Sequence, residues 1–126
     1  YDMSGGAWEY VAGYVNNGNG NLTSYGSSLV NGDAKTKNVY SKASSDSYEN
    51  NYNANSSKYG DAVYETSASG STSWYGDYSD FPYTSIPFFR RGGGYYNGTV
   101  AGVFCFNYSS GASDSYYSFR PVLVAL

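Results

Sequence analysis

The residue types that carry most enzyme chemistry are scarce in this sequence. It contains no histidine, and Cys105 is its only cysteine. A Ser-His-Asp triad, a Cys-His dyad, an intrachain disulfide and a histidine-rich zinc site are therefore excluded. Asp77 and Asp80 lie three residues apart and are the remaining candidates for a glycosidase-like carboxylate pair. Both fall in a Gly/Ser/Tyr turn, where Asp more often bonds its local backbone, so we expect no catalytic site.

The same two carboxylates are the candidates for a metal site. Calcium accepts irregular cages of oxygen ligands, which Asp77, Asp80 and nearby carbonyl groups could provide. No EF-hand spacing surrounds them. The expectation is a protein without a cofactor, with calcium at Asp77 and Asp80 as the alternative.

Tyrosine dominates the chemistry that remains, with 17 Tyr beside 16 Gly among 126 residues. Tyr offers a large contact area at low entropic cost, and Ser, Gly and Asn add adaptable polar contacts, as in antibody paratopes. The alternative is half-buried strand tyrosines with solvated hydroxyls. Because neighbouring strand residues point to opposite faces, at least one member of Tyr95-Tyr96 and of Tyr116-Tyr117 should face outward. The candidate ligand-binding residues are Trp74, Tyr75, Tyr95, Tyr96, Val100, Tyr108, Ser109, Ser110, Asp114, Tyr116 and Tyr117.

The charge pattern restricts the partners. The net charge is −3 and the isoelectric point about 4.6, and Arg90-Arg91 is the only adjacent basic pair. A nucleic-acid partner needs clustered Lys and Arg, so none is expected. No apolar run approaches the length of a membrane span, so no membrane insertion is expected. Four N-x-[ST] sequences make Asn21, Asn55, Asn97 and Asn107 candidates for glycosylation.

The elements that must position these residues are mostly strands and turns, because Tyr, Thr, Val, Ser and Gly outnumber the common helix formers. The length is typical of one domain, here residues 1–126. Residue 1 is Tyr rather than Met, which favours the C-terminal part of a longer precursor.

Local patterns predict the individual elements. Residues 7–12 are expected to form a strand or an irregular stretch, 16–31 a turn-rich segment, and 33–60 a long surface excursion with one short helix. Pro82 and Pro87 are expected to keep residues 81–89 out of a central strand. In 100–107, Val103 and Cys105 are expected on one face of a strand and Phe104 and Phe106 on the other. The predicted strands are 62–66, 71–75, 100–107 and a buried closing strand at 119–126.

Motifs at both ends of the chain resemble those of a known family. Met3-Ser4-Gly5-Gly6-Ala7-Trp8-Glu9-Tyr10 resembles the GNVWEW segment of formylglycine-generating-enzyme-like domains, which belong to the C-type-lectin-like superfamily. Arg91-Gly92-Gly93, Gly98 with Ala101-Gly102, and Ser118-Phe119-Arg120 resemble the closing block of that family. Together with GDAVYETS, STSWYGDYSDFPY and FRPVL, they resemble a bacterial surface-protein branch that often follows pilin-like helices. Residues 16–58 match poorly.

The resemblance implies an α+β, C-type-lectin-like fold with few short helices, a twisted antiparallel sheet and long irregular loops. It implies that the chain ends lie close together, with Trp8 in the core and Glu9 accepting hydrogen bonds from backbone NH groups or from Arg120. The alternative for Glu9 is a plain exposed carboxylate. The structural frame would be Trp8, Glu9, Arg91, Gly92, Gly93, Phe119 and Arg120. Family enzymes hold copper with a pair of thiols, so the single Cys105 argues against that catalysis.

Some branches of this superfamily diversify their closing block with retroelements. Residues compatible with that origin are Gly94, Tyr96, Val100, Cys105, Tyr108, Ser109, Ser110, Asp114, Tyr116 and Tyr117. The resemblance and the tyrosines together predict a non-catalytic, extracellular, cell-surface domain that displays residues 94–118 to a protein or glycan ligand on a cell or phage surface. The alternative is a structural subunit or tip domain of a pilus-like filament that uses the same tyrosines for subunit contacts. For the binding domain, Ala at Tyr96, Tyr108 and Tyr117 is expected to abolish binding without unfolding.

Overall fold

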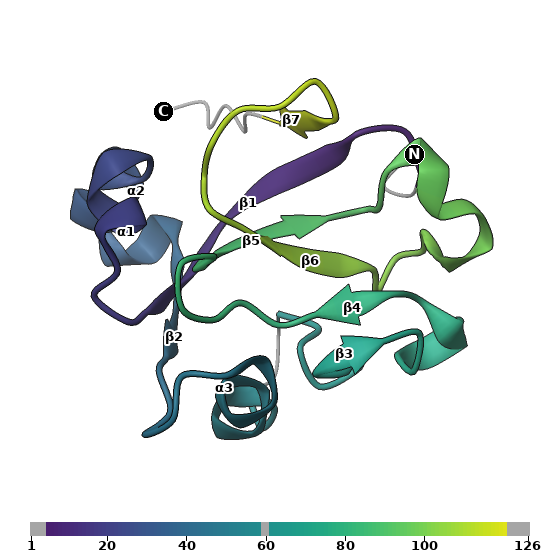
Figure 1. Ribbon diagram of the computed structural model, residues 1–126, viewed down its shortest axis with the longest axis horizontal. Helices are drawn as coiled ribbons and strands as arrows, with labels where there is room; N and C mark the ends of the chain where they lie inside the picture. The colour runs from purple at the N-terminus through teal and green to yellow at the C-terminus, as the bar shows by residue number, and fades with distance from the viewer. Residues whose placement is uncertain (1–4, 59–60, 121–126) are drawn as a thin grey trace.

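The computed structural model describes residues 5–58 and 61–120, which form one curled, mixed sheet with a few short helices around it (Figure 1). The α+β class is therefore as expected. Its elements in chain order are β1 (Trp8–Asn16), α1 (Gly20–Ser24), α2 (Ser27–Asn31), η1 (Ala34–Thr36), β2 (Asn38–Ser41), α3 (Tyr48–Asn55), β3 (Ser69–Gly70), η2 (Trp74–Gly76), β4 (Ser79–Asp80), β5 (Phe88–Arg91), η3 (Tyr95–Val100), β6 (Phe106–Ser109) and β7 (Tyr117–Phe119), where η marks a 3-10 helix.

The sheet runs in the order β2-β1-β5-β6-β4-β3, and β7 also pairs with β1. The pairings of β1 with β5, β5 with β6, and β3 with β4 are antiparallel. Those of β1 with β2, β1 with β7, and β4 with β6 are parallel. The expected antiparallel sheet is therefore wrong: each parallel pair joins strands linked by a long crossover, which the loop-rich segments of this chain provide.

Strands β1 and β5 bury side chains on both faces of the sheet, because successive strand residues point to opposite sides. One face holds Val15 and Phe89. The other holds Tyr14 and Phe88. The first core cluster is Val15, Tyr40, Val63, Phe81, Phe89 and Phe106, and the second is Tyr14, Leu22 and Phe88.

Helix α3 turns two asparagines and a tyrosine towards the core. Asn51 and Asn55 are fully buried and one helical turn apart, and the Tyr52 ring packs against that of Phe81, with centroids 5.9 Å apart. Asn51 donates to the Pro82 carbonyl oxygen (3.1 Å) and Asn55 to the Ser41 carbonyl oxygen (2.8 Å). Ser47 caps the helix by accepting a bond from the Asn50 backbone NH (3.3 Å). Residues 33–60 do contain one α-helix as expected, but they are not a plain surface excursion.

Two predicted strands are turns instead. In 62–66, the Thr66 NH bonds the Val63 carbonyl oxygen (3.1 Å), and Ala62 has a φ of 57°. In 71–75, the chain enters η2, where Tyr75 has a φ of 63°. A positive φ removes both residues from extended geometry. The turn-rich segment 16–31 contains α1 and α2, each of 5 residues.

The remaining strands are displaced from their predicted positions. The strand predicted at 7–12 continues to Asn16. The strand predicted at 100–107 begins only at Phe106, after η3 and a turn in which the Cys105 NH bonds the Gly102 carbonyl oxygen (3.0 Å). Phe88 and Phe89, expected outside a central strand, begin β5 between β1 and β6, because Pro87 precedes the ladder and removes no bond from it. Of the predicted closing strand 119–126, only Phe119 belongs to β7, and residues 121–126 lie outside the described residues.

Candidate binding face

Three exposed tyrosines pack against one another at one edge of the molecule. Tyr95 and Tyr96 begin η3, and Tyr116 directly precedes β7. Their ring centroids are 5.6 Å apart for Tyr95–Tyr96, 6.2 Å for Tyr95–Tyr116 and 5.9 Å for Tyr96–Tyr116. Their side chains are 69%, 57% and 44% exposed, respectively. This tyrosine cluster is a preformed aromatic surface rather than three separate rings.

The buried indole of Trp8 holds the tyrosine cluster in place. Trp8 is fully buried, and its Nε1–H donates to the Tyr96 hydroxyl (2.7 Å). Gly94 makes the approach possible, because a Cβ there would lie 2.6 Å from the Tyr96 ring and 3.2 Å from Trp8. Asn97 accepts a bond from the Gly94 NH (2.7 Å), which closes the first turn of η3. Tyr96 is therefore both displayed and required by the frame.

A second aromatic cluster contains Trp74, Tyr75 and Phe104. The Tyr75 and Phe104 rings are stacked with centroids 6.0 Å apart, and Trp74 meets Phe104 edge-on at 5.7 Å. Trp74 is 54% exposed and Tyr75 is 90% exposed. The neighbouring Val103 is also exposed. We call this group the tryptophan cluster.

Asp77 positions the loop that carries Phe104. Its buried carboxylate accepts a bond from the Phe104 NH (2.9 Å). The carboxylate fits only beside a glycine, since a Cβ on Gly102 would lie 2.0 Å from it. The two clusters are also connected through the backbone, because the Tyr78 NH bonds the Val100 carbonyl oxygen (2.9 Å).

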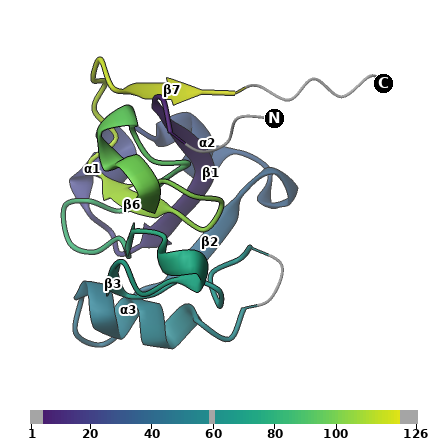
Figure 2. The same cartoon turned by 90° about the vertical axis from the view of Figure 1, so that its right-hand side faces the viewer.

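The segments η3 and η2, which carry residues of the two clusters, lie on the side of the molecule that faces the viewer in Figure 2, with η3 above η2. The segments that build this side are almost uncharged. Residues 71–78 contain only Asp77, which is buried, and residues 94–118 contain only Asp114. We call the two clusters together the aromatic face.

Arg90 connects the aromatic face to the sheet. It is only 6% exposed, and its guanidinium lies 5.1 Å from the Trp8 ring and 4.2 Å from the Tyr117 ring. Its Nε and Nη2 donate to the Tyr108 carbonyl oxygen (3.1 and 2.7 Å). Cation–π contacts of this kind are stabilising when the cation is desolvated. Tyr117 therefore belongs to the support and not to the displayed surface.

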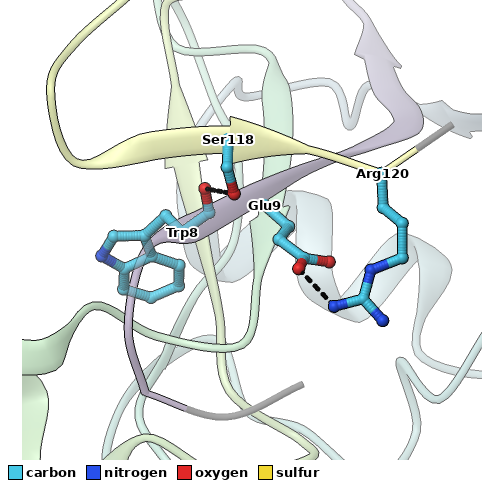
Figure 3. A network of polar contacts seen from close by, with 4 residues as sticks. All are labelled: Trp8, Glu9, Ser118 and Arg120. Atoms are coloured by element: carbon cyan, nitrogen blue, oxygen red, sulfur yellow. Dashed lines mark hydrogen bonds and ion pairs between the residues drawn. The ribbon is translucent and has the colours of Figure 1, made fainter. Parts of the chain in front are cut away.

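The strand pair β1–β7 brings the first and last motifs of the sequence together (Figure 3). Arg120 donates to the Glu9 carboxylate at 2.7 Å, and the Ser118 hydroxyl donates to the Trp8 carbonyl oxygen at 3.2 Å. Glu9 is thus paired with Arg120, as the resemblance implies. Phe119 does not have the role in the structural frame that the resemblance implies, because its side chain is 77% exposed and contributes little to the core.

The Arg-Gly-Gly motif forms the bend between β5 and η3. Gly92 and Gly93 have φ values of 88° and 73°, which favour glycine. A Cβ on Gly93 would lie 2.6 Å from that of Ala101, so the loop is packed too closely for any larger residue. Arg91 ends β5 and donates to the Asp61 carbonyl oxygen (2.5 Å).

Several candidate residues lie away from the exposed clusters. Ser109, expected to be displayed, is buried: its hydroxyl lies 2.6 Å from the Tyr10 hydroxyl, on the side of β6 that packs inward. Tyr108 is half-buried against Tyr83, with ring centroids 5.9 Å apart. Val100 and Ser110 are half-buried. Asp114 is exposed and lies beside the tyrosine cluster, where its carboxylate accepts a bond from the Tyr116 NH (3.3 Å).

The calcium candidates have protein partners. Asp77 bonds the Phe104 NH, and Asp80, also buried, accepts a short hydrogen bond from the Tyr78 hydroxyl. Within residues 5–58 and 61–120, no group of three or more His, Cys, Asp or Glu side chains is placed to hold a metal. The carboxylates act here as local structural acceptors.

The four N-x-[ST] sequences differ in whether the side-chain nitrogen of the asparagine, to which a glycan would be attached, donates a hydrogen bond. Asn55 is buried and its Nδ2 donates to the Ser41 and Asn51 carbonyl oxygens (both 2.8 Å), so its candidacy for glycosylation is wrong. The Nδ2 of Asn21 donates to the Ser85 carbonyl oxygen (2.7 Å). For Asn97 and Asn107, the described bonds use the side-chain oxygen only.

Val103 is exposed and Phe104 is half-buried, although the sequence pattern predicted a strand for both. The available signal was Gly102, which interrupts the predicted strand. Cys105 is buried, and burial raises the pKa of its thiol to about 11, so it is a poor nucleophile. Among the described residues, no helix is both long and apolar enough to cross a membrane.

No family model, curated protein or solved structure matches this chain.

Proposed function

We propose that this chain is a non-catalytic, extracellular recognition domain with a C-type-lectin-like fold, and that its aromatic face binds a protein partner. The supporting observation is the tyrosine cluster, in which Tyr95, Tyr96 and Tyr116 touch one another while remaining exposed. Exposed aromatic groups that are already ordered lose little conformational entropy on binding.

The composition of the face favours a protein over a glycan. The tryptophan cluster adds Trp74, Tyr75 and Phe104, and Trp and Tyr dominate the binding energy of protein interfaces. The low charge of the segments fits an interface core, which is depleted of charged residues. The pairing of Glu9 with Arg120 and the bend at Gly92 and Gly93 supply the frame that the family resemblance implies.

The test compares two double variants for capture of cell-surface proteins. Tyr95→Ala with Tyr116→Ala removes two exposed rings of the face, and the control Tyr25→Ala removes a 56% exposed ring elsewhere. Tyr96 and Tyr117 are spared, because the former accepts the Trp8 bond and the latter packs on Arg90. A second double variant, Trp74→Ala with Tyr75→Ala, covers the other cluster.

Quantitative mass spectrometry should find a partner that wild type and the control capture at least tenfold better than either double variant, with melting temperatures within about 5 °C. Equal capture by all variants would show that the face does not bind. Binding of the wild type, but not of the variants, to a glycan array would overturn the protein partner in favour of a glycan. Concentration-dependent polymers in light scattering that the variants lose would overturn it in favour of a filament of this chain.

A further inference from the structure

A cleft with a volume of about 390 Å³ lies where β2 joins β1. Its apolar wall includes Val11, Tyr40 and Phe89. The volume is near the lower end of the range for small-molecule sites, so a ligand of monosaccharide size would fill it. In Figure 2, β2 lies at the right and the η3 segment at the upper left, and no residue of the tyrosine cluster lines the cleft.

The cleft concentrates positive charge in a chain that is negative overall. Three of its 7 basic residues, Lys35, Lys37 and Arg91, line it, while Asp61 is the only carboxylate in the lining. A concave surface with one predominant sign of charge focuses the potential and attracts the opposite charge. The ligand that complements it is therefore an anion.

Arg91 is the cation best placed for this role. It is half-buried, and one of its NH groups donates to the Asp61 carbonyl oxygen (2.5 Å). No carboxylate in residues 5–58 or 61–120 lies within ion-pair distance of it. The Asp61 carboxylate instead accepts bonds from the Asn38 amide (2.9 Å) and the Tyr40 hydroxyl (2.7 Å). Burial lowers the pKa of the Arg91 guanidinium, and the nearby Asp61 and Glu65 carboxylates offset part of that shift.

The two lysines have different roles. Lys37 donates to the Leu29 carbonyl oxygen (3.1 Å) and to the Val30 carbonyl oxygen, so it ties the chain before β2 to the end of α2. The Lys35 side chain is exposed at the cleft and makes no hydrogen bond or ion pair with the described residues. Lys35 is therefore available to a ligand.

We propose that this cleft binds a small sugar acid, with the carboxylate paired to Arg91 and Lys35. The planar fork of an Arg side chain matches a carboxylate in two parallel hydrogen bonds. The C–H surface of the sugar ring would lie on the apolar wall. Tyr95, Tyr96 and Tyr116 do not line this cleft, so the site does not depend on the proposed function of the aromatic face.

Isothermal titration with glucuronate tests this site, with glucose as the neutral match and inorganic phosphate as the other anion. We expect glucuronate to bind with a Kd at or below about 1 mM in 50 mM NaCl, and binding to weaken as salt rises. Arg91→Gln should weaken it at least tenfold and Lys35→Gln about three- to tenfold. Lys42→Gln, at an exposed lysine outside the lining, should leave the Kd unchanged.

Lys35→Glu keeps the test decisive if Arg91→Gln fails to fold, because Lys35 is exposed and a reversed charge there should abolish binding. No heat of binding for glucuronate at 10 mM, glucose binding as tight as glucuronate, or phosphate binding as tight as glucuronate would each overturn the proposal. The double variant Tyr95→Ala with Tyr116→Ala should bind glucuronate as wild type does. Loss of one activity without the other separates this site from the aromatic face.

Discussion

Adjacent residues of the same type have different environments in this protein. Tyr116 is 44% exposed in the tyrosine cluster, whereas Tyr117 lies 4.2 Å from the buried guanidinium of Arg90. The two residues differ because Tyr116 lies in the turn before β7, whereas Tyr117 begins the strand. Tyr95 and Tyr96 are both exposed, and they begin a 3-10 helix rather than a strand. Asp77 shows the same dependence on neighbours, since its buried carboxylate needs the Phe104 NH and the space beside Gly102.

We expect Cys105 to lower the free energy of unfolding at alkaline pH. Burial, and next the nearby Asp77 carboxylate, raise the pKa of its thiol from 9.0 to about 11. The folded protein therefore keeps the thiol proton to higher pH than the unfolded chain does. Its contribution to the free energy of unfolding is complete below pH 8 and is lost as pH rises from about 9 to 11, by about 1.4 kcal/mol per pH unit at most.

Urea unfolding of wild type and Cys105→Ala between pH 8 and pH 10 measures this contribution. The variant should be less stable at pH 8, because a small buried side chain is truncated, but its stability should fall less over this interval. Burial also raises the pKa of the Tyr40 and Tyr78 hydroxyls, so both proteins should lose stability above pH 10. Parallel curves between pH 8 and pH 10 would contradict the role of the thiol.

At the level of elements, α3 shows why the spacing of apolar residues can fail to predict a helix. A surface helix usually presents an apolar stripe to the core. Here Asn51 and Asn55 lie inward beside Tyr52, and they make hydrogen bonds to the backbone of Ser41, Ala43 and Pro82 in place of apolar contacts. Strand β6 shows the opposite case, where an apolar run predicts a strand that begins only at Phe106, after a turn.

Asn55→Ala should destabilise the protein by about 2–4 kcal/mol, because it removes three hydrogen bonds of a fully buried side chain, two of them to the NH and carbonyl groups of Ser41. Asn53 is exposed on the same helix and provides the matched control. Asn53→Ala should change the stability by less than about 0.5 kcal/mol, and the change should be towards higher stability because Ala favours helix. Equal effects in chemical denaturation would show that the buried amide does not hold β2 to α3.

At the level of the whole molecule, Arg90 joins four strands that are far apart in sequence. It belongs to β5, packs on Trp8 of β1 and Tyr117 of β7, and bonds the Tyr108 carbonyl oxygen of β6. Arg90 packs on the Trp8 ring, and Trp8 in turn bonds the Tyr96 hydroxyl of the tyrosine cluster. The stability of the sheet and the geometry of the aromatic face are therefore expected to depend on the Arg90 side chain.

Arg90→Lys keeps the charge but loses the planar group that stacks between two rings and donates twice to one carbonyl oxygen. We expect a loss of about 2–4 kcal/mol in urea unfolding, with a changed Trp fluorescence spectrum from the altered surroundings of Trp8. Arg120→Lys is the control, since its ion pair with Glu9 is half exposed on the arginine side and should cost no more than about 1 kcal/mol. A small effect at Arg90 would mean that ring packing alone holds the strands.

Much of the candidate face was predictable from residue types. Tyr95, Tyr96, Tyr116, Trp74 and Tyr75 were expected at the surface because an uncharged, Tyr-rich segment with Ser and Gly is typical of recognition loops. Ser109 was misassigned, since whether a serine points outward depends on the register of its strand, and β6 places it against Tyr10.

The amino-acid sequence by itself determined composition-level properties: few helices, no thiol pair, little charge in the tyrosine-rich segments, and a strand around Trp8. These follow from local preferences and from counting. Only the tertiary structure decided that three of the strand pairings are parallel, that Tyr96 supports Trp8, and that Lys35, Arg91 and Asp61 share a cleft. Such contacts join residues up to 111 positions apart, as Glu9 and Arg120 are, and their geometry depends on loop closure and packing rather than on local pattern.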